Sequence, residues 1–287
     1  MRALVTGAGG LLGAAVAREC ASRAEVHARH RDTLDVTDAR AVRDTIARVR
    51  PDVVINCAAF NDVDRAEDDP VTAIRVNALA VLALAGAARD FDAALVHYSS
   101  DFVFDGETNR PYREEDRPNP RGVYAASKLL GDWFALEHPR SYVLRVESLF
   151  GDPGPQTMRT GSLSTIVARI RSGQEVPVFV DRIVSPTHTA DIARATLTLL
   201  ETGAAPGLYH CANVGHATWA EIAAHAARLL ERPLRMKPIT LDTAGLRAPR
   251  PRYCALSSEK LAAAGVRMAP WQDAVQRYLA VAPLTGC

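Results

Sequence analysis

Residues 2–13 read RALVTGAGGLLG. The first five letters form an apolar run that predicts a buried strand, and helical spacing from Leu11 onward predicts a helix. Three glycines with G-x-x-G-x-x-G spacing fall on the turn between them. Glycine lets the backbone approach a pyrophosphate, and the helix N-terminus offers free N–H groups. A packing loop is the alternative interpretation. We expect a phosphate-binding turn lined by Gly7, Gly10, Leu11, Leu12 and Gly13.

From this turn, strands and helices alternate through the first half of the chain. Strands alternating with helices of ten or more residues indicate βαβ units. We therefore expect an α/β fold with a Rossmann-type, doubly wound parallel sheet. The predicted strands are 2–6, 25–28, 52–56, 94–99 and 141–146, and the predicted helices are 11–23, 39–50, 70–89 and 124–137.

The second half is less regular. It suggests a smaller, interleaved C-terminal α/β part that binds substrate. We expect a nucleotide-binding domain over 1–146, with returning segments at about 176–212, and a substrate-binding part from 147–175 and 213–287. Helices are predicted at 163–172, 189–201, 219–230 and 271–281, strands at 176–180 and 207–212, and a loop at 151–161. The tryptophans Trp133, Trp219 and Trp271 fall in helical patterns and are expected to be packing residues.

Composition excludes several classes of protein. Among 287 residues, 34 are Lys or Arg and 33 are Asp or Glu, so the net charge of +1 argues against a nucleic-acid binder. No apolar run reaches the roughly 18–20 residues needed to span a bilayer, so we expect no membrane association. The five cysteines have no metal-ligand spacing and are interpreted as reduced thiols of a cytoplasmic protein.

The end of the second strand predicts the preferred dinucleotide. It reads HARHR over 27–31 and lacks the acidic residue that usually binds a ribose 2′-hydroxyl. Arg29 and Arg31 can pair with a 2′-phosphate, which favours NADPH and leaves NADH as the second option. Asp35 and Val36 are expected beside the adenine. A solvated basic turn is the alternative interpretation.

Catalytic chemistry is predicted by YAASK, residues 124–128. Tyr124 and Lys128 are spaced i, i+4 and share a helix face. An ammonium beside a phenol lowers the pKa of the phenol, which makes tyrosine a usable general acid. Ser99 and Ser100 lie at the end of the fourth predicted strand, where a serine hydroxyl can hydrogen-bond a substrate carbonyl. A strand-end cap is the alternative role of these serines.

These stretches resemble the extended short-chain dehydrogenase/reductases, and within them the dTDP-4-dehydrorhamnose reductase family. The resemblance covers nearly the whole chain and includes VTGAGGLLG at 5–13, HYSSDFVFDG at 97–106, VYAASKLLGD at 123–132 and SPT at 185–187. It implies NADPH-dependent reduction of the 4-keto group of a nucleotide-activated 6-deoxy sugar. It therefore implies a nucleotide-sugar substrate as partner, with a homodimer as an open option.

The resemblance also implies roles for individual residues. Tyr124 is expected to donate the proton, Lys128 to hold the nicotinamide ribose and tune Tyr124, and Ser100 to polarise the carbonyl. Ala58 and Ala59 are expected near the adenosine, with Asn77 on the next helix among the cofactor residues. Arg250 is expected to pair with the diphosphate of the sugar nucleotide, or else to be a surface charge.

Some positions depart from the family pattern. Ser148 stands where the family has a tryptophan, Glu147 adds a carboxylate, and Arg182 replaces a glutamine. In some members of the family an acidic residue of the first helix takes part in a metal-bridged dimer. Ala15 stands at that position here, so no metal is expected. These departures leave the sugar open, and the expected substrate contacts are Asp101, Phe102, Glu147, Ser148, Arg182 and Arg250.

Two other functions remain open at this stage. One is a non-catalytic NADP-binding regulatory subunit resembling the methionine adenosyltransferase β subunit. The other is a sugar-nucleotide epimerase, which would retain bound NAD.

Overall fold

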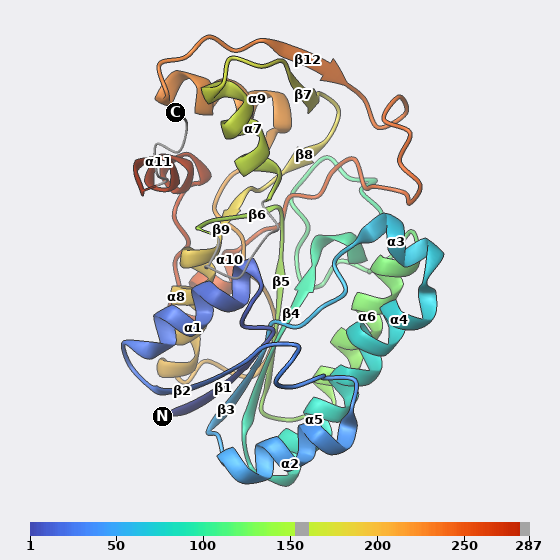
Figure 1. Cartoon of the computed structure of the whole chain (residues 1–287), viewed down its shortest axis with the longest axis vertical. Coiled ribbons are helices and arrows are strands. Elements are labelled where there is room, and N and C mark those ends of the chain that lie inside the picture. Colours follow the sequence, from blue (N-terminus) through green and yellow to red (C-terminus); the bar gives the residue numbers. More distant parts are fainter. Residues whose placement is uncertain (153–160, 282–287) are drawn as a thin grey trace.

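The computed structural model describes residues 1–152 and 161–281, and most of the predicted loop at 151–161 lies outside them. Its centre is a six-stranded sheet in the order β10-β5-β4-β3-β1-β2, in which all neighbouring strands are parallel (Figure 1). The strands are β1 (Arg2–Thr6), β2 (Glu25–Arg29), β3 (Val53–Asn56), β4 (Ala94–Ser100), β5 (Ser141–Val146) and β10 (Gly207–His210). The order reverses between β1 and β3, which confirms the doubly wound sheet and places a crevice at their carboxyl ends.

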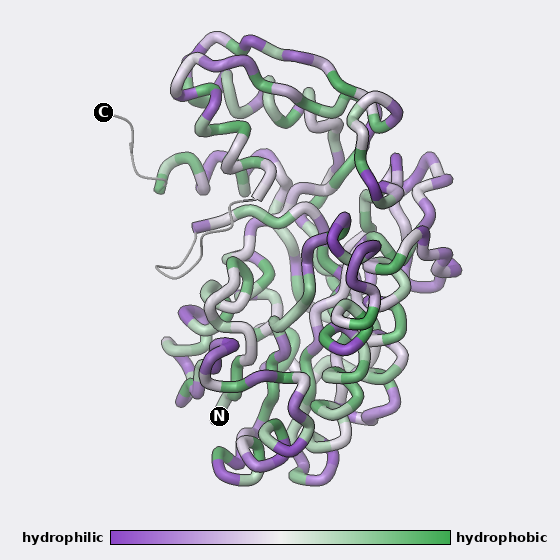
Figure 2. Tube along the Cα trace, turned by 45° about the vertical axis from the view of Figure 1, so that its right-hand side comes forward, coloured by the Kyte–Doolittle hydropathy of each residue, from purple (hydrophilic) through white to green (hydrophobic). Residues whose placement is uncertain are grey.

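Helices cover both faces of this sheet (Figure 1). On one face α1 (Leu11–Ala21) packs against α8 (Thr189–Glu201). On the other, α2 (Ala39–Val49) packs against α5 (Ala80–Asp90), and α5 packs against α6 (Val123–Leu136). Apolar segments accordingly run through the middle of the lower part in Figure 2. The Asp38 side chain caps α2 by accepting from the N–H groups of Arg40 and Ala41.

The helix predicted at 70–89 is continuous but irregular. It consists of α4 (Pro70–Ile74), a π-helical turn η1 (Arg75–Leu79) and α5. By length and composition Pro70–Asp90 could cross a membrane, so the prediction that no segment is long enough was wrong. Half of its apolar window is buried in the protein, against α2 and α6 among others. The acidic segment before it forms a short helix, α3 (Val63–Asp68).

A second, smaller part lies over the carboxyl ends of the central strands (Figure 1). Its core joins α7 (Ser162–Arg171), α9 (Trp219–Leu229) and α11 (Trp271–Val281). The remaining strands and helices are η2 (Asp101–Val103), β6 (Leu149–Phe150), β7 (Val176–Phe179), β8 (Ile183–Val184), β9 (Thr187–His188), β11 (Ala217–Thr218), β12 (Met236–Ile239) and α10 (Glu259–Ala263).

One expected boundary needs correction. Strand β7 pairs with β12 and not with the central sheet, so the chain does not return to the first part at about 176. The return begins with α8, which packs against α1, and is completed by β10, which pairs with β5. Alternation in the sequence identified β7 as a strand but carried no information about its partner.

Candidate active site

A pocket of about 610 Å³ lies between the two parts, at the carboxyl ends of the central strands. Its wall combines the glycine-rich turn, the end of β4, the first turns of α6 and the residues after β5. The residues predicted as site residues that line it are Gly10, Leu11, Leu12, Gly13, Ala59, Ser100, Asp101, Phe102, Tyr124, Lys128, Glu147, Ser148 and Arg182.

The glycine-rich turn is shaped as a cradle. Gly7 has φ +66°, and a Cβ there would lie 2.5 Å from the backbone nitrogen of Ala58. A Cβ on Gly13 would lie 2.2 Å from the carbonyl oxygen of Gly7. Among the described residues no side chain caps α1, and its first residues, Leu11 and Leu12, face the pocket. Main-chain N–H groups at an uncapped helix start fit a pyrophosphate, so the residues present suit a dinucleotide.

The residues predicted around the adenosine do not all line this pocket. Arg29 ends β2 and donates to the carbonyl oxygen of Ala28 at 3.1 Å, and Arg31 is exposed. Asp35 accepts from the backbone and hydroxyl of Thr37, and these bonds lower its pKa, with a smaller contribution from the charge of Arg31. Val36 is buried, and the backbone of Ala58 packs against Gly7. The assignment of these residues to the cofactor stays a prediction.

Asn77 has a different role from the one expected. Its side chain is buried, accepts from Phe60 N at 2.8 Å and donates to Phe60 O at 3.1 Å and to Ser127 Oγ at 3.0 Å. The amide is therefore committed to protein groups. It ties the loop after β3, which carries Ala59, to α6, and we assign it to positioning that loop in place of the expected cofactor contact.

Ser100, Tyr124 and Lys128 come together in the pocket. Lys128 is buried and donates from Nζ to the carbonyl oxygen of Tyr98 at 2.6 Å. Ser100 Oγ donates to Asp101 Oδ1 at 2.9 Å and accepts from Phe102 N at 3.2 Å, so this side chain also caps η2.

The protonation of the tyrosine differs from the expectation. Burial raises the pKa of Tyr124 to about 12, although the neighbouring Ser100 and the charge of Arg250 act the other way. Burial also lowers the pKa of Lys128 to about 8. The prediction that Lys128 lowers the pKa of Tyr124 was wrong for the protein alone, because burial outweighs the neighbouring charges. Tyr124 is thus a neutral phenol that holds its proton near pH 7.

Phe102 packs against Tyr124 and two arginines. Its ring meets Tyr124 edge-on at 5.5 Å, and the guanidinium carbons of Arg182 and Arg250 lie 5.3 Å and 5.8 Å from its centroid. Arg250 also pairs with Asp64 at 3.0 Å, and its side chain is 12% exposed. It is therefore neither a surface charge nor free of a countercharge, and its pairing with a diphosphate stays a prediction.

Three residues that depart from the family pattern line the pocket, namely Glu147, Ser148 and Arg182. Ser148 has φ +44°, an unusual conformation for a residue with a side chain and one often found at functional sites. Glu147 is buried, and Arg182 donates to Cys254 Sγ at 3.5 Å. Nothing in the sequence spacing pointed to Cys254.

Trp219 was expected to be a packing residue. It is buried in the second core but also lines the pocket, together with Ser148. Trp271 is buried as expected, whereas Trp133 is 57% exposed, so the packing prediction was wrong for that residue.

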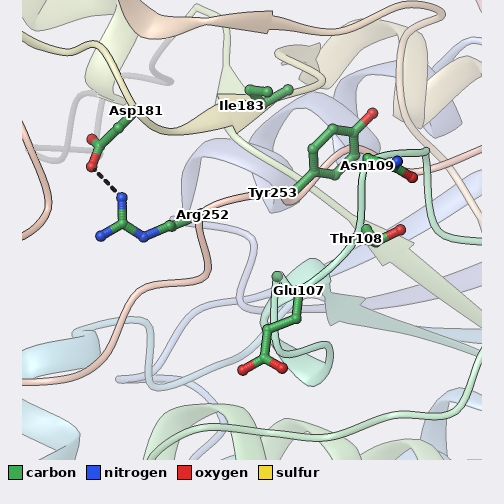
Figure 3. A pocket seen from close by; sticks show the side chains of 8 residues that line it. Glu107, Thr108, Asn109, Asp181, Ile183, Arg252 and Tyr253 are labelled. Carbon is green, nitrogen blue, oxygen red and sulfur yellow. Dashed lines mark hydrogen bonds and ion pairs between the residues drawn. The ribbon is translucent and has the colours of Figure 1, made fainter.

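A second hollow of about 600 Å³ lies beside the 181–183 segment (Figure 3). Arg252 and Asp181 form an ion pair at the edge of this hollow, with a distance of 2.9 Å between their charged groups. Tyr253 also lines the hollow. None of its lining residues belongs to the Ser100, Tyr124 and Lys128 group, so we place the chemistry in the first pocket. The lining residues are Gly106, Glu107, Thr108, Asn109, Asp181, Ile183, Arg252 and Tyr253.

The chain is similar to known proteins over nearly its whole length. The model of the RmlD substrate binding domain matches residues 1–283. A dTDP-4-dehydrorhamnose reductase of Streptomyces griseus is 38% identical over 284 residues, covering 96% of this chain and 91% of the relative.

Two solved structures of dTDP-4-dehydrorhamnose reductases are similar throughout. The one from Clostridium acetobutylicum superposes with a TM-score of 0.90 at 31% identity, covering 98% of this chain and 99% of the other. The one from Bacillus anthracis, in complex with NADP, has a TM-score of 0.90 at 29% identity and covers 97% and 98%.

Proposed function

Because the chain belongs to the RmlD substrate-binding family of extended short-chain dehydrogenase/reductases, we propose that it reduces the 4-keto group of a nucleotide-activated 6-deoxy sugar with NADPH. The observation that carries the proposal is the convergence of Ser100, Tyr124 and Lys128 on one pocket with the glycine cradle. A cofactor cradle and a proton donor in one cavity are what carbonyl reduction needs.

In this mechanism the residues of the chain bind, orient and move a proton. The cradle residues hold the pyrophosphate, and the dihydronicotinamide supplies a hydride when bound. Ser100 orients the substrate carbonyl, and the Tyr124 hydroxyl donates its proton to the developing alkoxide. Lys128, anchored on Tyr98 O, holds the cofactor ribose. Because Tyr124 keeps its proton near pH 7, it can donate this proton to a ketone, as reduction requires. It is less suited to abstract a proton from an alcohol.

The substrate contacts are part of the proposal. Asp101, Glu147, Ser148 and Arg182 line the pocket beyond the catalytic group, where the sugar ring has to lie if its carbonyl reaches Tyr124. The arginine and carboxyl groups there can recognise sugar hydroxyls by hydrogen bonds. The arginines at 29 and 31 are the proposed contacts of the cofactor 2′-phosphate.

The test is NADPH oxidation with dTDP-4-keto-6-deoxy sugars, including the L-configured ketosugar and its unepimerised precursor. Oxidation with either supports a ketoreductase. Tight NADPH binding without turnover of any ketosugar supports the regulatory-subunit alternative. Isomerised sugar with retained NAD supports the epimerase alternative.

We also propose a homodimer that uses one apolar helical face. Val71, Leu79 and Leu82 of the segment Pro70–Asp90 are exposed, as are Trp133 and Leu136 of the adjoining α6. Such a group of exposed large apolar residues is typical of an interaction surface. Sedimentation of Leu82→Glu with Trp133→Glu should show monomers, whereas Val214→Glu, an exposed position elsewhere, should leave the dimer intact.

The proposed compartment is the cytoplasm. Cys20, Cys57, Cys211 and Cys254 are free thiols, and three of them are buried. Unpaired thiols are typical of reducing compartments. A thiol count on protein isolated without reductant tests this.

A further inference from the structure

We propose that Asp101 and Glu147 hold one proton between them beneath the pocket and return it to Tyr124 through the Ser100 hydroxyl after each turnover. The inference rests on the proposed reductase function for its catalytic part. The shared proton itself can be tested without substrate.

The two carboxyl groups form a close, dry pair. Asp101 is 4% exposed and Glu147 is 1% exposed. One oxygen of each and the Cys254 Sγ lie within 4.8 Å of one another. Asp101 Oδ2 and Glu147 Oε1 are buried and have no hydrogen-bond partner among the described residues. Two carboxylates this close and away from water repel each other strongly, so in the resting protein one of them keeps its proton.

The charges around the pair support a single shared proton. Arg182 is the cation that acts on both carboxyl groups. Ser185 N donates to Glu147 Oε2 at 2.8 Å, so the remaining oxygen of Glu147 is the one free to carry hydrogen. One guanidinium balances one carboxylate, and the second carboxyl group is then neutral. A fixed guanidinium among these groups also disfavours a metal ion at this place.

Other titratable groups facing the pair are neutral phenols and a thiol. Tyr124 faces Asp101, Tyr253 faces Glu147, and Cys254 faces both. Burial raises the pKa of each of these three groups and, in the pair itself, the pKa of Glu147 well above its ordinary value. None of the three therefore supplies the missing charge near neutral pH.

A route of neighbouring side chains leads from the pair to the reacting atoms. Ser100 Oγ donates to Asp101 Oδ1 at 2.9 Å, and Ser100 lines the pocket together with Tyr124, whose pKa it acts to lower. Lys128 lies outside this route, because its Nζ is directed to Tyr98 O. The route therefore runs through three side chains, from Glu147 and Asp101 to Ser100 and then to Tyr124.

The proton balance of the cycle is as follows. As hydride adds to the substrate carbon, the carbonyl π-electron pair moves to oxygen, which takes the Tyr124 proton and leaves a phenolate. The Ser100 hydroxyl passes its hydrogen to the phenolate and receives one from the carboxyl pair. The pair is left as two carboxylates, and a proton from water restores it, so each turnover consumes one hydride and one proton.

Glu147→Gln is the direct test, because glutamine keeps the size of the side chain and an oxygen for Ser185 N. The matched control is Glu114→Gln, a half-buried carboxyl outside the pocket that accepts from His210 N at 2.7 Å. Infrared spectra of the resting protein at neutral pH should show a protonated carboxyl band that Glu147→Gln and Asp101→Asn remove and that Glu114→Gln retains. A wild-type spectrum that matches Glu147→Gln in this region overturns the shared proton.

Kinetics test the return of the proton. At saturating substrate, kcat of Glu147→Gln should fall about 10-fold or more with NADPH affinity little changed, as expected for lost proton transfer. The wild-type kcat should fall as pH rises through the pKa of the pair, and the variant should lose that limb. Wild-type kcat and pH profile in Glu147→Gln would overturn the relay even if the infrared band is confirmed.

A wild-type protein that reduces no ketosugar contradicts the proposed function and leaves the infrared result to decide whether the pair shares a proton. If Glu147→Gln folds poorly, the infrared and kinetic measurements are made on Asp101→Asn instead.

Discussion

Arg145 and Asp132 form an ion pair closed off from solvent, with Arg145 Nε 3.0 Å from Asp132 Oδ2 and side-chain exposures of 3% and 1%. Asp132 lies one helical turn after Lys128 on α6, and Arg145 lies on β5 two residues before Glu147. The pair thus joins α6, the helix of Tyr124, to β5, the strand that precedes Glu147.

Asp132→Asn should destabilise the fold strongly, because it leaves the buried charge of Arg145 without a countercharge. The free energy of unfolding should fall by about 3–5 kcal/mol in denaturant titrations. Glu107→Gln, which breaks the exposed pair with Arg121, is the control and should cost about 1 kcal/mol or less. Equal effects of the two changes would contradict a structural role for the buried pair.

Tyr124→Phe should abolish the proton donor while keeping the ring that meets Phe102 edge-on. We expect kcat to fall about 10²–10⁴-fold, the usual contribution of a positioned general acid. NADPH affinity, measured by fluorescence titration, should change little. Unchanged turnover would remove Tyr124 as the acid.

Gly7→Ala and Gly173→Ala separate backbone strain from steric contact. Both glycines have φ +66°, but a Cβ at position 7 would lie 2.5 Å from Ala58 N, whereas at position 173 nothing lies within 4 Å. Gly173→Ala should cost about 1–2 kcal/mol of stability from the left-handed backbone alone. Gly7→Ala should cost more and also weaken NADPH binding. Retention of wild-type NADPH affinity in Gly7→Ala would argue against the cradle.

Arg29→Ala combined with Arg31→Ala tests the choice of cofactor. A guanidinium adds most to the binding of a 2′-phosphate, so the double variant should bind NADPH about 10-fold or more weakly and NADH nearly as before. Arg40→Ala, an exposed arginine on α2, serves as the control. An equal loss for both dinucleotides would remove the 2′-phosphate assignment.

Lys128 should make stability rise with pH in the alkaline range. Its pKa is about 8 in the folded protein, because of burial, and 10.5 is the reference value for the unfolded chain. Between these values the unfolded chain binds more protons, so raising the pH favours the fold by up to about 1.4 kcal/mol per unit. The free energy of unfolding, measured from about pH 8 to pH 10, should show this slope in the wild type and not in Lys128→Met. Parallel pH profiles would show that Lys128 is not perturbed by burial.

Many helices and strands along the chain were predictable because they depend on local pattern. The strand at Arg2–Thr6 and the helix at Trp271–Val281 have the predicted bounds, since apolar periodicity reports the buried face of each element. Irregularities within an element were harder to predict from the sequence. The π-helical turn Arg75–Leu79 lies inside one continuous helical pattern, and nothing in that pattern marks it.

The joint position of Tyr124 and Lys128 in the pocket wall was also predictable, because these residues are one helical turn apart. The carboxyl pair was predictable only as two separate candidates. Asp101 follows β4 and Glu147 follows β5, and their contact depends on strand pairing. Cys254 and Trp219 reach the site from distant parts of the chain through tertiary packing, which spacing along a sequence does not encode.

The interleaved course of the chain has a consequence for engineering. After β5 the chain builds part of the substrate-binding region, returns to supply α8 and the edge strand β10, and leaves again. An exchange of the sugar-binding region between relatives therefore cannot be made at a single splice point. A chimera joined only after residue 146 would receive a foreign edge strand against β5 and a foreign helix against α1. Successful grafts will have to carry α8 and β10 with the cofactor half, as two or more separate cassettes.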